Sequence, residues 1–271
     1  MKPLANSFNN FRQGRINSRA EARKQLVFRN NLEKRFFRQL TSLFNKFVNT
    51  NLYLYSEFGQ YEPSLAEQRL NEEFMPLMLA HYRRTFKAMY NFDEDRVQSR
   101  KADDTFVFGR SVDFENVVNQ YFASRQLILT GISAKMASRI SNLIEQGRAD
   151  DLTLSQIAKL VSVKFKAISR SRAALIARTE THNAASFANH SYHATVQQDL
   201  GMKMMKKWVA TSDGRTRPAH AFANGQTVDM DDDFIVGGIR MDYAGDPKGG
   251  AANVINCRCV IIYADEQDII E

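Results

Sequence analysis

The pattern of apolar residues changes near Gly201, and this change limits the folds that the chain can adopt. Before Gly201, apolar residues recur every three or four positions over long stretches, which is typical of amphipathic helices. After it, short alternating segments are separated by turn compositions such as "SDGRTRP" and "AGDPKGG", which indicates short strands. The sequence therefore predicts an α+β protein, mainly helical in its N-terminal two-thirds, followed by a small antiparallel β unit packed on helices.

The first helices are expected from periodicity and capping signals. Residues 21–50 place apolar side chains on one face, with basic residues between them. A second helix is expected to begin at Ser64, which forms an S-x-x-E capping box with Glu67. Because proline lacks an amide hydrogen and clashes with the preceding turn, Pro76 is expected to kink or divide this helix.

The middle of the chain is expected to alternate loop and helix. The charged stretch 91–113 predicts a loop with a short strand at 105–108. A further helix is expected over about 113–147, with an interruption near Gly131.

Two more helices are expected before the β unit. A capping box from Thr153 to Gln156 predicts a helix start, and a separate helix follows up to about residue 200. Gly201 provides the C-terminal signal of that helix. Within it, Glu180 lies in an alanine-rich stripe, where a buried carboxylate needs a partner.

The positive charge is concentrated at the N-terminus. The chain has a net charge of +7, yet residues 1–50 contain eleven Lys or Arg against two Glu. A basic arm predicts contact with nucleic acid or an acidic protein surface, and a solvated helix face is the alternative. The candidate contact residues are Arg12, Arg15, Arg19, Arg23, Lys24, Lys34, Arg35 and Arg38.

No signal for membrane insertion or secretion is found in the sequence. There is no run of 18 apolar residues, and the N-terminus has no apolar centre followed by a cleavage site. We therefore expect that the protein does not contact a membrane. We also expect that it is synthesised in a cytoplasm.

Two cysteines, Cys257 and Cys259, are the only ones in the chain. A C-x-C pair cannot build a disulfide framework, and a bridge between the two would close a strained ring. With His220 and Asp213 they offer zinc ligands, whereas two small thiols facing a core are the favoured interpretation. We therefore expect no cofactor and keep zinc as the alternative.

The same region carries candidates for a structural cluster. An arginine can bind a carboxylate through two parallel hydrogen bonds, so we expect Glu180 to pair with Arg215 or Arg217, with Asp213 supporting the turn. Trp208 is expected to anchor the core. Nearby, the helix residues His182, Asn189 and His193 are interpreted as a polar helix face.

Catalysis is the competing interpretation of this cluster. His220 with Glu180, Asp213 or Asp242 could act as a general base in a nuclease or transferase. However, the sequence has no phosphate-binding glycine loop, no G-x-S-x-G elbow and no H-E-x-x-H motif. We therefore assign no catalytic residue.

A series of short motifs resembles a known family. The segments "ISRSRAALIARTETHNAAS" (168–186), "KKWVATSDGRTRPAH" (206–220), "NG" (224–225), "GDP" (245–247) and "VINCRCV" (254–260) are similar, in order and spacing, to the phage Mu F-like or head morphogenesis domain of minor head proteins. The residues at the motif positions are Glu180, Trp208, Asp213, Arg215, Arg217, His220, Asn256, Cys257 and Cys259. The structural cluster expected from them is Glu180, Trp208, Asp213, Arg215, Arg217, His220, Asn256 and Arg258.

The resemblance implies a non-enzymatic minor structural protein of a tailed-phage head. It implies a place inside the virion near the portal, after synthesis in the host cytoplasm, and a role in head assembly, with DNA packaging or ejection as a further role. The expected partners are the portal protein, the major capsid or scaffolding protein and packaged DNA. The domains expected are a helical region over 1–150, whose basic arm docks to portal or capsid, and a head morphogenesis domain over 151–271. A metal-assisted nuclease or hydrolase and a DNA-binding accessory protein remain the alternatives.

Overall fold

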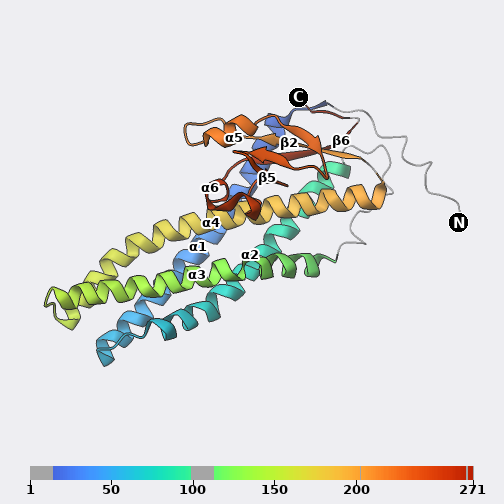
Figure 1. Ribbon diagram of the computed structural model, residues 1–271. Helices are drawn as coiled ribbons and strands as arrows, with labels where there is room; N and C mark the ends of the chain where they lie inside the picture. Colours follow the sequence, from blue (N-terminus) through green and yellow to red (C-terminus); the bar gives the residue numbers. More distant parts are fainter. Residues whose placement is uncertain (1–14, 99–112, 202, 267, 271) are drawn as a thin grey trace. The chain divides into compact units, whose positions relative to one another are not determined.

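The structure of this protein is a computed structural model that describes residues 15–98, 113–201, 203–266 and 268–270. Four long helices come first: α1 (Ser18–Phe58), α2 (Pro63–Gln98), α3 (Phe114–Ala149) and α4 (Leu154–Leu200). Figure 1 shows that the strands follow in the C-terminal segment, apart from the two-residue β1 (Arg15–Ile16). The predicted α+β class, with helices first and small antiparallel sheets last, is confirmed.

The chain divides into two compact units. The helical unit contains the described residues of 33–83 and 115–178, and the mixed unit those of 1–32, 84–114 and 179–271. Helices α1, α2 and α4 contribute residues to both units. The boundary expected near residue 150 falls in the turn that joins α3 to α4, and the assignment of separate domains to 1–150 and 151–271 stays a prediction.

Aromatic side chains fill the core of the helical unit. Phe36, Phe44, Phe74 and Phe165 are fully buried, and the ring of Phe36 stacks on His81 with centroids 3.7 Å apart. These residues lie on the apolar faces of the amphipathic helices, where burying each side chain stabilises the fold by about 1.5–3 kcal/mol.

Of the two helix starts predicted from capping boxes, one is confirmed and one is wrong. Thr153 and Gln156 form the predicted capping box, since Thr153 N donates to Gln156 Oε1 at 2.8 Å and Gln156 N donates to Thr153 Oγ1 at 3.3 Å. The start predicted at Ser64 is wrong, because α2 begins one residue earlier at Pro63. The fixed φ of proline suits the first helical position.

Three interruptions expected from the sequence do not occur. Helix α2 runs through Pro76 without being divided and continues to Gln98, so part of the loop expected at 91–113 is helical. The strand expected at 105–108 lies outside the described residues. Helix α3 continues through Gly131, and α4 is one helix of 47 residues where two were expected. Packing along a long helix outweighs the cost of about 1 kcal/mol for one internal glycine.

The mixed unit carries the β structure. Strand β2 (Met204–Val209) lies between β3 (Thr227–Asp229) and β6 (Val260–Asp265) in an antiparallel sheet, and Trp208 pairs with Ile261. Strands β4 (Phe234–Val236) and β5 (Ile239–Met241) form a hairpin. Its turn residues Gly237 and Gly238 have φ angles of +60° and +79°, which a two-residue hairpin turn requires.

Short elements complete this unit. They are α5 (Pro218–Ala223), the 3₁₀ helix η1 (Pro247–Gly249), α6 (Gly250–Val254) and β7 (Ile269–Ile270), which pairs in parallel with β1. Helix α4 ends at Leu200, and Gly201 follows with a φ of +61°, as the sequence predicted for a helix C-terminus. In the described part of the chain, no helix has both the length and the apolar character needed to cross a membrane.

Candidate functional site

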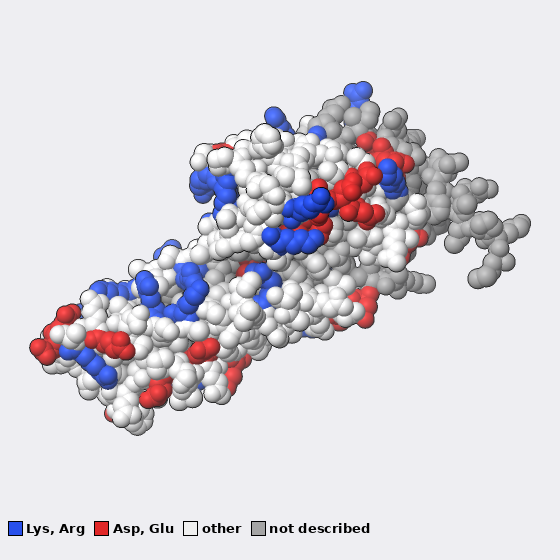
Figure 2. Space-filling view, viewed as in Figure 1, with Lys and Arg blue, Asp and Glu red and all other residues white. Residues whose placement is uncertain are grey.

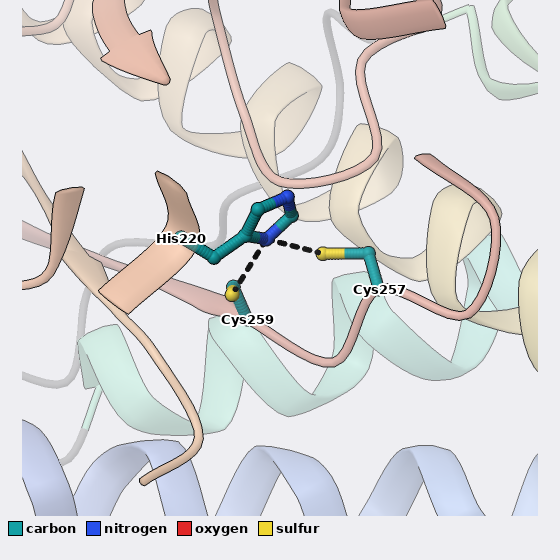
Figure 3. A group of neighbouring side chains, drawn as sticks. All are labelled: His220, Cys257 and Cys259. Carbon is teal, nitrogen blue, oxygen red and sulfur yellow. Dashed lines mark hydrogen bonds between the residues drawn. The ribbon is translucent and has the colours of Figure 1, made fainter. Parts of the chain in front are cut away.

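His220, Cys257 and Cys259 lie together in the core of the mixed unit (Figure 3). His220 comes from α5, and the cysteines come from the segment that joins α6 to β6. The Nδ1 atom of His220 lies 3.3 Å from Cys259 Sγ and 3.7 Å from Cys257 Sγ. All three side chains are 2% exposed and both cysteines are free thiols. Tertiary structure thus unites three of the four residues that the sequence offered as metal ligands.

Each of the two thiols shifts the pKa of the other. Their mutual hydrogen bond lowers the pKa of Cys257 well below its usual range and raises the pKa of Cys259. This hydrogen bond makes Cys257 the more acidic of the two thiols. The sulfur atoms are therefore chemically distinct from thiols in a purely apolar core.

Asp213, the fourth candidate metal ligand, has a different role. Arg258 donates to both of its carboxylate oxygens, with Nη2 at 2.7 Å from Oδ1, and the Arg258 side chain is 23% exposed. This hydrogen bonding holds the pKa of Asp213 well below its usual range. Arg215 lies on the same carboxylate at 3.5 Å, and the main-chain N–H of Arg215 donates to Asp213 Oδ1. Asp213 therefore stabilises the turn by binding the guanidinium groups of Arg258 and Arg215.

The partners expected for Glu180 make other contacts. Arg215 is an exposed partner of Asp213, and Arg217 donates to the main-chain carbonyl of Ile255. Glu180 itself is buried, with 3% exposure, as its place in the alanine-rich stripe predicted. Arg215 therefore binds the carboxylate of Asp213, two positions earlier in the chain, whereas Arg217 binds a main-chain carbonyl.

Asn256 and Trp208 support the segment that carries the cysteines. Asn256 has a φ of +58°, a conformation that Asn tolerates better than most residues, and its N–H donates to Thr179 Oγ1 at 3.2 Å. Trp208 is fully buried and meets the rings of His220 and Phe234 edge to face. Trp208 thus lies in the core of the mixed unit, and Asn256 contacts α4 through its main chain.

A buried polar layer on α4 was not predicted from the sequence. His182, Asn189 and His193 were interpreted as a polar helix face, yet their exposures are 5%, 1% and 1%. The layer is centred on Arg29 of α1, whose Nη1 lies 3.4 Å from His182 Nδ1 and donates to Ser186 Oγ at 3.1 Å. Its signal in the sequence was Arg29 itself, a cation at a position in the apolar stripe of α1.

An acid from α2 balances this buried cation. Asp93 is fully buried and lies 3.7 Å from His193 Nε2. Burial lowers the pKa of Arg29 to about 10, and the charge of Asp93 opposes this change. Arg96, also from α2, lies 2.9 Å from His193 and donates to the carbonyl of Tyr263 on β6. The layer thus joins three long helices to the sheet within the mixed unit.

His190 is expected to make the stability of the mixed unit depend on pH. Burial, together with the charge of Lys206, lowers the pKa of His190 to about 4. Because the unfolded chain binds this proton near pH 6.5, stability is fully present above pH 6.5 and is lost as pH falls towards 4. His190 alone should cost about 2 kcal/mol at pH 5 relative to pH 7. Urea unfolding at both values should show a smaller loss for His190→Gln than for wild type, and equal losses would contradict this assignment.

The candidate contact residues of the N-terminal arm are exposed where the structure describes them. Arg12 lies outside the described residues, and Arg15 is exposed in β1. On α1, the exposed candidate cations are Arg19, Arg23, Lys24, Lys34, Arg35 and Arg38. By contrast, the sheet carries mixed charges, including Lys203 with Asp229 and Lys248 with Asp242, and Figure 2 shows red and blue side chains intermingled on the face drawn.

Part of the chain matches a known protein family. Residues 138–262 match the family described as Phage Mu protein F like protein, a range that contains His220, Cys257, Cys259 and the Asp213 turn. This segment, a little under half of the chain, is therefore similar to the Phage Mu F-like family. No solved structure matches the chain.

Two individual proteins are similar to this chain. The minor head protein GP7 of Bacillus phage SPP1 is 25% identical over 276 residues, which cover 94% of this chain and 85% of that protein. The NAD(+)--arginine ADP-ribosyltransferase EFV of Enterococcus faecalis (strain ATCC 700802 / V583) is 32% identical over 151 residues, which cover 54% of this chain and 30% of that protein. The family and the phage relative support a structural role in a phage head, hence a location in the virion and contact with other head components.

Proposed function

We propose that this protein is a minor structural component of a tailed-phage head that binds the portal and acts in head assembly. The observation that carries the proposal is similarity to a minor head protein over 94% of this chain and 85% of that relative. Similarity of that extent includes the four long helices as well as the motif region. The helices α1–α4, of 36 to 47 residues each, are long enough to contact neighbouring head proteins along their length.

The chemistry of the motif supports a structural role over catalysis. Asp213 is bound by Arg258, Arg217 by a main-chain carbonyl, and His220 is buried at 2% exposure with its ring nitrogens beside Asn253 and the cysteines. A general base must reach its substrate, and a residue this deeply buried has no access to one. We therefore propose that similarity to the ADP-ribosyltransferase, which involves 30% of that enzyme, reflects a shared structural segment.

The test is the copy number of the protein in purified heads of the phage that encodes it. Quantitative mass spectrometry should give a low and reproducible ratio to the portal protein. Heads assembled without portal should lack the protein if the portal is its docking partner. Absence from complete heads would overturn the structural role, and unchanged abundance in heads without portal would overturn portal binding.

We further propose that the exposed cations of α1 contact packaged DNA. Binding of this kind depends on phosphates and weakens as salt rises, by about 0.9 in the log–log slope for each phosphate contact. Replacing Arg19, Arg23, Arg35 and Arg38 with Gln should therefore lower the affinity of the full chain for duplex DNA at low salt and reduce that slope. Fluorescence anisotropy over a salt series measures both quantities.

The matched control removes equal charge elsewhere. Arg139, Lys159, Lys166 and Arg170 are also exposed cations on long helices, so their replacement with Gln changes net charge by the same amount. The control should retain the wild-type slope. Equal losses in the two variants would show that net charge, and not the α1 surface, determines binding.

A further inference from the structure

The arrangement of ligand atoms around His220 has the dimensions of a metal site. Zinc binds sulfur at about 2.3 Å and nitrogen at about 2.0 Å, so tetrahedral ligands stand about 3.5 Å (nitrogen to sulfur) apart. The two distances from His220 Nδ1, 3.3 Å and 3.7 Å, bracket that value. The three ligand atoms all lie within 4.8 Å of one another. The two nitrogen-to-sulfur distances therefore suit ligation of a single tetrahedral ion.

The tautomer of His220 is set for metal binding. Its Nε2 lies 3.3 Å from Asn253 Oδ1, an oxygen that can only accept a hydrogen bond. Nε2 therefore carries the proton in the neutral ring, which leaves the lone pair of Nδ1 directed at the two sulfur atoms (Figure 3). Metal-binding histidines characteristically donate their other ring N–H to an oxygen in this way.

Additional donors surround the sulfur atoms. Arg29 lies on His182 Nδ1, so the neutral His182 ring carries its proton on Nε2, beside Cys257. Trp208 Nε1 lies beside Cys259. Both nitrogens are buried and find no hydrogen-bond partner of normal geometry among the described residues. A thiolate would be a stronger acceptor than a thiol for the N–H groups beside it.

We propose that His220, Cys257 and Cys259 bind one zinc ion that holds α5 against the segment preceding β6. The ligands are His220 Nδ1 and two thiolates, and the fourth tetrahedral position is left for a water molecule. Binding releases the thiol protons to solvent, so the ion is bound more weakly as pH falls. Because the ligands are buried, the ion acts on the fold, and this inference does not depend on the proposed role in the phage head.

The first experiment measures metal content in the full chain. Protein purified without added chelator should contain about one zinc per chain by mass spectrometry of the metals. The Cys257→Ser, Cys259→Ser double variant and His220→Ala should lose it. Asp213→Asn is the matched control, because Asp213 is bound to Arg258 and should leave zinc content unchanged.

The second experiment keeps the proposal testable when those variants fail to fold. Wild-type protein stripped with a chelator and titrated with Co²⁺ should bind one ion, with a near-ultraviolet thiolate-to-cobalt charge-transfer band and the strong visible bands of a tetrahedral site. Zn²⁺ should displace the cobalt and abolish both signals. Wild-type protein that holds no zinc and gives no such band on titration would overturn the proposal, as would full zinc retention by the folded double cysteine variant.

Discussion

Trp208→Ala is expected to lower the free energy of unfolding by about 3–5 kcal/mol, as for other large-to-small changes in a well-packed core. Trp208 is fully buried on β2, the central strand of the sheet, and contacts Phe234 from the β4–β5 hairpin and His220 from α5. Its loss would leave a cavity where the hairpin, α5 and the sheet meet, and these elements cannot all move in to fill it.

Chemical denaturation of the full chain measures this loss, and Phe222→Ala is the control. Phe222 lies on α5 but is 88% exposed, so its removal should change the free energy of unfolding by less than about 0.5 kcal/mol. A Trp208→Ala protein as stable as the Phe222→Ala protein would mean that Trp208 is not the anchor of this core.

Arg29→Met is expected to be nearly as damaging, at about 3–5 kcal/mol, because it leaves a buried acid without its cation. Arg29 is 4% exposed, and Asp93 is fully buried nearby. The hydrogen bonds from Arg29 to Ser186 and Gln25 would also be lost. Arg23→Met, an exposed position on the same helix, is the control and should be close to neutral.

A double-mutant cycle with Asp93→Asn separates charge from packing. If the two charges are coupled, Arg29→Met should cost less in the Asp93→Asn protein than in wild type. Equal costs in both backgrounds would assign the effect of Arg29 to packing and to its neutral hydrogen-bond partners. Urea unfolding of the four proteins at one pH supplies all the values that the cycle needs.

Local chemistry explains which features could be predicted from the sequence. The Thr153–Gln156 capping box and the helix end before Gly201 depend on residues within three positions of each other, so their sequence signal is complete. The α+β class follows from the change in periodicity, which is set by how each side chain meets the core. The motif segments of the site were also visible, because their residue types are unusual and close in sequence.

Contacts between distant segments explain the errors. Of the two outcomes expected at Pro76, a kink or a division, the division did not occur, and neither did the interruption at Gly131, because helix packing outweighed the local preference of one residue. His182, Asn189 and His193 have the composition of a solvated helix face, yet Arg29 and the α2 residues cover them. Gly245 shows the same limit, since a Cβ there would lie 2.4 Å from Asn183 Oδ1, a neighbour 62 positions earlier in the chain.

The sequence by itself determined the fold class, the cap at Thr153, the helix end at Gly201 and the family motif. Each of these depends on patterns among residues that are close together in the chain. Only the tertiary structure decided which polar groups meet. In that structure Asp213 binds Arg258 and is not part of the cysteine group. The Nδ1 atom of His220 lies within 3.7 Å of both sulfur atoms. The physical reason is that burial of a charge or a thiol has a cost that only a partner from another element offsets, and the choice of partner depends on packing in three dimensions.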